Sequence, residues 1–325
     1  MRRRDPSAAA TVSPTAVPEL PDITVYVDAL RARICGRTLQ TVNLRSPFVL
    51  RTVSPPLREA EGKRVRAVSR LGKRIVITLD DDLHLLLHLM KLGRLRWTDD
   101  RTRARAPGGK VLLCSLVFEG GALHLIEIGP KKRASLHVVQ GSAALAMFDA
   151  GGVEPLEVEL EAFDAALRRN NHTLKRALTD PRIVAGIGNA YSDEILHAAR
   201  LSPLALTSKL SPEDMARLFE ATRATLTTWV ERLREQTGDG FPEKVTAFRE
   251  GMAVHGRYRQ PCPVCETEVQ RIVYADRETN YCPGCQTGGR PLADRALSRL
   301  LGKDWPRSLE ALEELRNPEV KEARR

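Results

Sequence analysis

Four cysteines near the C-terminus form the pattern that most constrains the fold of this chain. Cys262 and Cys265 make one Cys-x-x-Cys pair, and Cys282 and Cys285 make a second pair after sixteen intervening residues. Two such pairs at this spacing are typical of tetrahedral zinc sites, and they favour a metal over a redox-active dithiol. The pattern predicts one structural Zn²⁺ ion held by four thiolates. The residues between the pairs are expected to form a hairpin that the metal holds rigid.

The charge balance indicates the kind of partner. The chain has 325 residues, with 51 Lys and Arg against 41 Asp and Glu, and so carries a net charge of +10. A basic surface favours a polyanionic partner, nucleic acid first. No apolar run approaches the length of about 18 residues that a transmembrane helix needs, so no membrane association is expected. The two remaining cysteines are isolated, which suits a reducing cytoplasm better than a disulfide framework.

The N-terminal segment contains a second informative pattern. Residues 1–16 lack hydrophobic periodicity and are rich in Ala, Ser, Thr and Pro, which predicts disorder; an organellar transit peptide is the alternative. Pro18 and Glu19 follow. Inside a chain the proline nitrogen is a tertiary amide, but at a free N-terminus it is a secondary amine that can attack an electrophilic sugar carbon. Glu19 would then be the neighbouring acid that handles protons.

The rest of the chain divides by its periodicity. Asp22 to Arg33 has helical spacing, with Gly36 as its stop, and six strand-like segments follow between Thr38 and Val139, which predicts a β-sandwich. The composition changes at residues 149–159, which predicts a hinge between two domains. A helix is expected over residues 160–178. Another is expected to begin at Ser211 and Pro212 and to bury Met215, Leu218, Phe219, Thr222, Leu226, Val230 and Leu233.

Several of these stretches resemble one family in consistent order. Pro18-Glu19-Leu20-Pro21-Asp22 resembles the PELPE opening of the Fpg/Nei family of DNA glycosylase/lyases. Residues 179–194, TDPRIVAGIGNAYSDE, resemble the helix-two-turn-helix of that family, with Pro181 in place of Gln. The cysteine pairs match its zinc finger. The resemblance covers Pro18 to Cys285 and implies an α+β multidomain fold with an N-terminal β-sandwich, a helix-two-turn-helix domain and a C-terminal zinc-finger hairpin.

The resemblance also implies roles for individual residues. Pro18 matches the nucleophile, Glu19 its acid, and Lys73 the catalytic-loop lysine that contacts the DNA phosphate and the lesion site. Independently of the family, the glycines of residues 186–188 let a backbone approach closely, a helix N-terminus binds phosphate, and Asn189 is expected to cap that helix. The expected DNA-binding residues are His88, Lys91, Lys175, Asn189, Tyr191 and Arg277.

Two loops depart from the family pattern. Lys91 stands where relatives have an apolar wedge that fills the space left by a flipped nucleotide, and a lysine fills it poorly. Residues 129–134, GPKKRA, lack the Phe of the loop that reads the opposite base in the guanine-specific branch. The substrate is therefore left open among oxidised purines, oxidised pyrimidines and abasic sites. His84 and His88 are four residues apart, but the surrounding run is strand-like, so no second zinc site is expected.

The combined reading is a bifunctional DNA glycosylase/AP lyase of base excision repair; the alternative is a catalytically inactive protein that binds damaged DNA. Its expected partner is double-stranded DNA with damaged bases or abasic sites, bound by a monomer in the bacterial cytoplasm at the nucleoid. Val17 stands where the initiator Met stands in relatives, so initiation at a GTG codon there, followed by removal of the first residue, would expose Pro18. The expected divisions are 1–17 (extension or mis-assigned start), 18–148, 149–159, 160–252, 253–290 and a helical extension at 291–325.

Overall fold

A computed structural model describes residues 17–99, 107–243, 249–274, 277–293, 302 and 305–316. The segment 1–16, for which disorder is predicted, lies outside the described residues, as do most of residues 291–325. The backbone of Arg277 is described, but its side chain is not. Among the described residues, no helix combines the length and apolar character that crossing a bilayer requires.

The first helix, α1 (Leu20–Ile34), starts immediately after the Pro18-Glu19 pair and runs slightly longer than predicted. Pro21 occupies its first turn, where a missing N–H costs nothing. The chain leaves the helix through Gly36 at φ +78°, a conformation that glycine adopts without strain. The buried side chains that α1 contributes to the core of the adjoining β domain are Ile23, Tyr26, Val27, Leu30 and Ile34.

Eight strands form the predicted β-sandwich, as two antiparallel four-stranded sheets. The first sheet has the order β1 (Leu39–Leu44), β6 (Leu112–Phe118), β7 (Gly121–Glu127), β5 (Gly93–Thr98). The second has the order β2 (Val65–Leu71), β3 (Arg74–Leu79), β4 (Leu83–His88), β8 (Ser135–Gln140). Their inner faces and α1 share one hydrophobic core. Strands β5 and β8 are additional to the six predicted, because β5 carries two arginines and β8 follows a basic loop, which obscured their apolar alternation.

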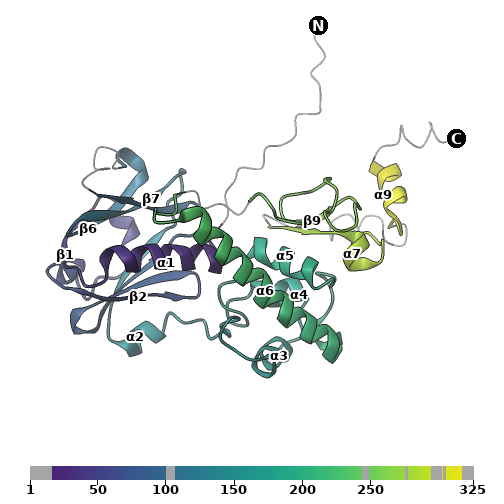
Figure 1. Cartoon of the computed structure of the whole chain (residues 1–325), viewed down its shortest axis with the longest axis horizontal. Coiled ribbons are helices and arrows are strands. Elements are labelled where there is room, and N and C mark those ends of the chain that lie inside the picture. The colour runs from purple at the N-terminus through teal and green to yellow at the C-terminus, as the bar shows by residue number, and fades with distance from the viewer. Residues whose placement is uncertain are drawn as a thin grey trace, which may run out of the picture.

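A helical domain follows the sandwich (Figure 1). After the short α2 (Ser142–Ala146), it comprises α3 (Leu160–Arg168), α4 (Leu174–Thr179), α5 (Asn189–Ala198) and α6 (Pro212–Thr237). The prediction of one continuous helix over 160–178 was wrong. The chain leaves the helix after Arg169, and Thr173 is extended so that the backbone N–H of Leu174 donates to Ala205 O at 2.8 Å.

Helix α6 begins where the sequence predicts. Ser211 is its N-cap, and its side chain accepts a hydrogen bond from Asp214 N at 3.1 Å. The helix packs against both α1 and α5 (Figure 1), so it joins the β-sandwich to the helical domain. All seven residues predicted for its buried face are buried: Met215, Leu218, Phe219, Thr222, Leu226, Val230 and Leu233.

The C-terminal part carries the predicted hairpin between the cysteine pairs. Strands β9 (Gln270–Tyr274) and β10 (Arg277–Tyr281) pair antiparallel, and α7 (Pro283–Thr287) begins directly after Cys282. Beyond it, α9 (Leu309–Arg316) lies in the C-terminal extension, and the indole of Trp305 donates to Pro291 O at 3.3 Å. The helical character expected of this extension is present in its described residues.

The contribution of the Ser211 cap to the stability of α6 can be measured by removing its side-chain acceptor. Replacing Ser211 with Ala should lower the free energy of unfolding by about 1 kcal/mol, because it removes the acceptor for a terminal N–H. Urea denaturation measures the change. Ser142→Ala, at an exposed position at the start of α2, is the matched control and should stay within about 0.5 kcal/mol of the parent. Equal losses in both variants would contradict the capping role.

Candidate active site

The carboxylate of Glu19 lies on the N-terminus of α5. Its Oε2 accepts from Gly188 N at 2.6 Å and from Tyr191 N at 3.3 Å, and its Oε1 accepts from Ala190 N at 2.9 Å. The side chain is 3% exposed. Backbone N–H groups that the helix itself leaves without partners therefore hold both oxygens of this side chain in place.

Lys73 reaches the same place from the turn between β2 and β3. A Cβ placed on Gly188 would lie 2.5 Å from Glu19 Cδ and 2.7 Å from Lys73 Nζ. The carboxylate and the ammonium group therefore meet over Gly188, whose missing side chain makes the space for both. Gly72, at φ +56°, supplies the tight turn that delivers Lys73.

The segment that carries Glu19 is fastened on both sides. Leu20 N donates to Gly186 O at 2.8 Å, and Gly186 is held at φ +79° with Leu20 packed against it. Asp22 accepts from Glu19 N at 2.9 Å and pairs with Arg249 at 2.5 Å. Pro18 is buried one residue ahead of Glu19. In the full sequence its nitrogen is an amide with Val17.

Asn189 has a different role from the predicted one. Gly188 is the N-cap of α5, and Asn189 is the first residue of the helix, so the expected cap is wrong. Its side-chain amide instead donates to Glu278 O on β10 at 2.7 Å. The carboxylate of Glu19 takes the N–H groups that a cap would have satisfied. Asn189 thereby ties the zinc-finger hairpin to the N-terminus of α5.

Lys175 is placed one helix away, in a buried polar network. Its ammonium group donates to Asn189 O at 2.7 Å and to Asp193 Oδ1 at 2.5 Å. Asp193 is fully buried and also contacts His255 Nδ1 at 2.8 Å and Asn280 Nδ2 at 3.4 Å. Burial opposes its charge, but Lys175 and His255 outweigh that effect and hold the pKa of Asp193 below its usual value. Lys175 thus supports the backbone of Asn189.

The side chain of Tyr191 lies in the core of the helical domain. It is 1% exposed and packs edge-on against Trp229, with ring centroids 5.9 Å apart. The structure therefore does not bring its phenol to the surface with the other expected DNA-binding residues. What it presents at the site is its backbone N–H, directed at Glu19.

His88 ends β4 in the second sheet, directly opposite Arg74 of β3. Because His84 lies on the same strand, the two histidines are not a helical pair, as the sequence indicates. Burial, together with the charges of Arg74 and Lys73, lowers the pKa of His88 to about 4. The imidazole is therefore neutral near pH 7, and it would meet a phosphate as a hydrogen-bond donor.

The two divergent loops lie at the ends of the strands. Lys91 is exposed in the turn between β4 and β5, after Met90 at φ +54°, and Arg94 donates to its carbonyl at 3.1 Å. In the second loop, the carboxylate of Glu127 accepts from Arg133 N at 2.8 Å and from Ala134 N at 3.1 Å. The buried carboxylate of Glu127 thus fixes the backbone of the basic loop at Arg133 and Ala134.

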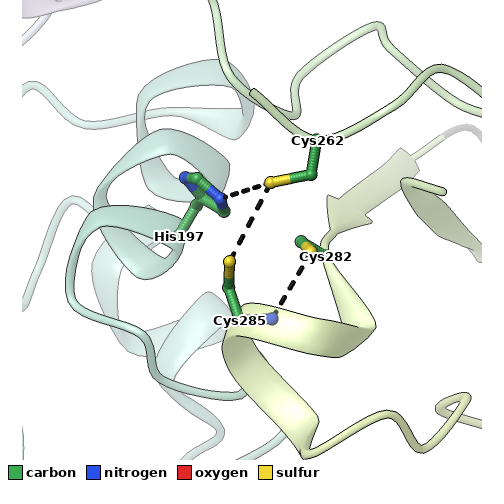
Figure 2. A group of neighbouring side chains, drawn as sticks. All are labelled: His197, Cys262, Cys282 and Cys285. Atoms are coloured by element: carbon green, nitrogen blue, oxygen red, sulfur yellow. Dashed lines mark hydrogen bonds between the residues drawn. The ribbon is translucent and has the colours of Figure 1, made fainter. Parts of the chain in front are cut away.

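The four predicted cysteines are gathered in one cluster. The sulfur of Cys265 lies 3.3 Å from that of Cys282 and 3.4 Å from that of Cys285, and the sulfur of Cys262 lies 3.9 Å from that of Cys285. Four thiolates bound to zinc at about 2.3 Å in a tetrahedron lie about 3.8 Å apart. The cluster fits one structural zinc ion, which would leave no open position for catalysis. Figure 2 shows His197 of α5 beside three of these cysteines, Cys262, Cys282 and Cys285. Its Nε2 lies 3.3 Å from Cys262 Sγ.

Sequence reasoning missed three contributors to this site. Arg249 and His197 meet their partners only through the fold, and nothing in their sequence neighbourhood indicates it. Asp193 lies in the stretch that resembles the helix-two-turn-helix. It follows Asn189 by four residues, so the two side chains lie on one face of α5, and this spacing could have indicated that Asp193 contributes to the site.

Three family models match the chain in sequence order. The model described as formamidopyrimidine-DNA glycosylase N-terminal domain matches residues 17–128. The formamidopyrimidine-DNA glycosylase H2TH domain matches residues 152–239, and the zinc finger found in FPG and IleRS matches residues 259–288. The last two segments contain α5 and the four cysteines.

Two proteins that are similar in sequence carry the same family name as these models. The formamidopyrimidine-DNA glycosylase of Thermus thermophilus is 34% identical over 284 residues, which are 84% of this chain and 100% of that protein. A formamidopyrimidine-DNA glycosylase-like protein of Mycobacterium tuberculosis is 43% identical over 150 residues, 46% of this chain and 93% of that protein.

Solved structures share the fold. A complex of Lactococcus lactis Fpg with DNA containing an abasic site aligns with a TM-score of 0.72 and 25% identity, covering 83% of this chain and 99% of that one. The MutM (Fpg) protein of Thermus thermophilus aligns with a TM-score of 0.71 and 32% identity, covering 84% and 100% of the two chains.

The fold and the three matched domains are those of a DNA glycosylase of base excision repair. The chain belongs to the formamidopyrimidine-DNA glycosylase family, in which AP lyase activity is typical. The resemblance read from the sequence is thereby confirmed.

A side chain at position 188 would test whether the site needs the space that Gly188 leaves for Glu19 and Lys73. Gly188→Ala would push a methyl group into Glu19 and Lys73, and a displacement of about 1 Å can cost about 100-fold in rate. We expect a loss of that size in glycosylase activity on an oxidised-base duplex, measured by gel-based cleavage. Gly108→Ala, where an added Cβ meets nothing within 4 Å, should retain full activity. Normal activity in the Gly188 variant would contradict the close packing of Glu19 and Lys73 over Gly188.

The neutrality of His88 predicts a pH dependence. Its folded-state pKa of about 4 lies below the ordinary 6.5, so the neutral imidazole favours folding and this contribution is lost as the pH falls from 6.5 towards 4. Side-chain ¹⁵N NMR, with the signal assigned from His88→Gln, should show no protonation between pH 7 and 5.5. A midpoint at or above 6.5 would contradict the burial and charge environment.

Proposed function

We propose that this protein is a bifunctional glycosylase and AP lyase that acts on oxidised bases and abasic sites in duplex DNA through the amine of Pro18. The observation that carries the proposal is the convergence of Glu19, Lys73 and the N-terminus of α5 beside Pro18. A carboxylate and an ammonium group held over one glycine provide a proton-handling pair and an anion contact, and the carboxylate belongs to the residue that directly follows Pro18.

The chemistry follows from these groups. The secondary amine of Pro18 attacks C1′ of a flipped nucleotide, and the base leaves with its bonding electron pair and takes a proton from water. The carboxylate of Glu19 takes the N–H proton from the attacking amine and passes it to the ring oxygen as the bond between C1′ and that oxygen breaks, which leaves an iminium ion between C1′ and the proline nitrogen. Loss of a proton from C2′ expels the 3′ phosphate, and a second elimination expels the 5′ phosphate. Water then hydrolyses the iminium and returns the free amine.

Phosphate binding is assigned to the surrounding groups. We infer that Lys73 and the neutral imidazole of His88 contact phosphates beside the lesion, and that Lys91 reaches the DNA from its exposed turn. Lys175 and Asn189 hold the loop before α5 and the hairpin that carries Arg277 in the positions such contacts require. Tyr191 takes part through its backbone. With several basic contacts to phosphate, binding should weaken steeply as salt rises.

The lesion class rests on the relatives. Lactococcus lactis Fpg has been solved with DNA containing an abasic site, an oxidised pyrimidine and Fapy-dG. The same breadth is inferred for this chain. Lys91 in place of an apolar wedge favours lesions whose partner base is already unstacked, abasic sites above all, since a lysine fills the gap poorly. The protein is proposed to act as a monomer at the bacterial nucleoid.

The amine of Pro18 must be free for this chemistry. We infer that the active chain begins at Pro18, through initiation at Val17 and removal of that residue. N-terminal sequencing of the protein from its native source should find Pro18 first. Active enzyme with an intact Met1 would contradict this inference.

Borohydride trapping tests the mechanism directly. Protein that begins at Pro18 should form a covalent adduct with abasic-site DNA in the presence of borohydride, because the iminium is reducible. Protein that begins at Met1 should form none, and a Pro18-start protein with Glu19→Gln should lose glycosylase activity. If the Pro18-start protein binds the DNA but gives no adduct, the lyase proposal fails and the protein is a damaged-DNA-binding protein.

A further inference from the structure

His197 lies outside the segment that the zinc-finger model matches, yet its side chain lies against the cysteine cluster. It sits near the end of α5 and is 6% exposed. Its Nε2 and the sulfurs of Cys262, Cys282 and Cys285 all lie within 4.8 Å of one another. Figure 2 shows the imidazole directed from its helix at the sulfur of Cys262, which belongs to the zinc-binding segment.

We propose that His197 donates an Nε2–H hydrogen bond to the thiolate of Cys262 and thereby fixes the zinc-binding segment to α5. Its distance of 3.3 Å suits such a bond. Four cysteine thiolates are enough to fill a tetrahedral zinc site, and Cys265 Sγ lies 3.3 and 3.4 Å from two of the other sulfurs, so we assign the imidazole as a positioning group outside the ligand set. Outer hydrogen bonds of this kind orient metal ligands and tune their basicity.

The charge of the cluster explains why a donor belongs there. Four thiolates and one Zn²⁺ carry a net charge of −2, which is costly where the ligands are buried. Cys262 and Cys282 are both buried. Cys282 Sγ accepts from Cys285 N at 3.4 Å, and the hydroxyl of Thr267 lies 3.4 Å from Cys265 Sγ. His197 supplies the corresponding contact to Cys262.

A second contact joins the same two parts. The side chain of Gln286, on α7, accepts from Cys282 N at 2.8 Å and donates to Leu201 O, just beyond α5, at 2.9 Å. Together with His197 it docks the metal-binding turns on the end of α5. The other end of that helix holds Glu19. His197 therefore links the zinc site to the helix that organises the active site.

Zinc release and a cobalt spectrum test the proposal, which rests on the zinc site and is independent of the lyase chemistry. His197→Phe keeps a planar ring but has no donor. We expect it to speed zinc release to a coloured chelator about 10-fold. In the cobalt-substituted protein it should move the sulfur-to-cobalt charge-transfer band to lower energy, because the thiolate loses its hydrogen bond. The d–d bands should stay in place, since the four sulfur ligands are unchanged.

Matched variants separate this role from packing. His197→Gln retains an N–H donor and should restore much of the slow release. His124→Phe removes another buried imidazole, in the β-sandwich, where it contacts Ser115 and Thr98 at 2.8 Å, and should leave zinc release unchanged. Unaltered release and an unaltered charge-transfer band in His197→Phe would overturn the proposal. A shift of the d–d bands would also overturn it, because it would make His197 a ligand. Failure of borohydride trapping would affect none of these readouts.

Discussion

The contact between the carboxylate of Glu19 and the N-terminus of α5 is the interaction on which the arrangement of this protein depends. It joins residues that are 169 to 172 positions apart in the chain, and it is made of hydrogen bonds to a charged acceptor, which contribute about 1.5–3 kcal/mol each. Glu19 also directly follows Pro18 in the chain, so the same hydrogen bonds fix the position of that proline. In this protein the acid itself anchors the N-terminal segment to the second domain.

The other contacts at the site converge on the same helix. Asn189 binds the hairpin, and Glu194 accepts backbone N–H groups from Ala253 at 2.7 Å and from His255 at 2.8 Å. The buried carboxylate of Asp193 contacts both Lys175 and His255. Each of these side chains lies on α5, so a ten-residue element orients the N-terminal segment, the helical domain and the zinc-binding segment together. A buried charge with several partners is destabilising if one partner is lost, which makes this network sensitive to single substitutions.

Much of this could be predicted from the sequence, and the remainder has physical reasons. The cysteine spacing, the stretch around Glu19 and the turn at residues 186–188 are local patterns with local causes, and they predicted the zinc cluster, the α+β fold and the family. The break between α3 and α4 was missed because partners at Ala205 and Thr207, distant in sequence, stabilise it. Asn189 was taken for a cap because its type suits one, but Glu19 occupies that position. The inward orientation of Tyr191 follows from packing against Trp229, which no local pattern encodes.

The length of α5 has a consequence for how this family can vary. Ten residues at about 1.5 Å each set a span of about 15 Å between the Glu19 end and the end near His197. Deleting or inserting a single residue between Asn189 and His197 would shorten or lengthen that span only slightly. It would, however, rotate everything beyond it by about 100° around the helix axis. A substitution within α5 changes one side chain, whereas a change of length would rotate the residues that contact the zinc-binding segment relative to the end that binds Glu19. The number of residues in α5 is therefore more tightly constrained by the structure than the identity of most of its side chains.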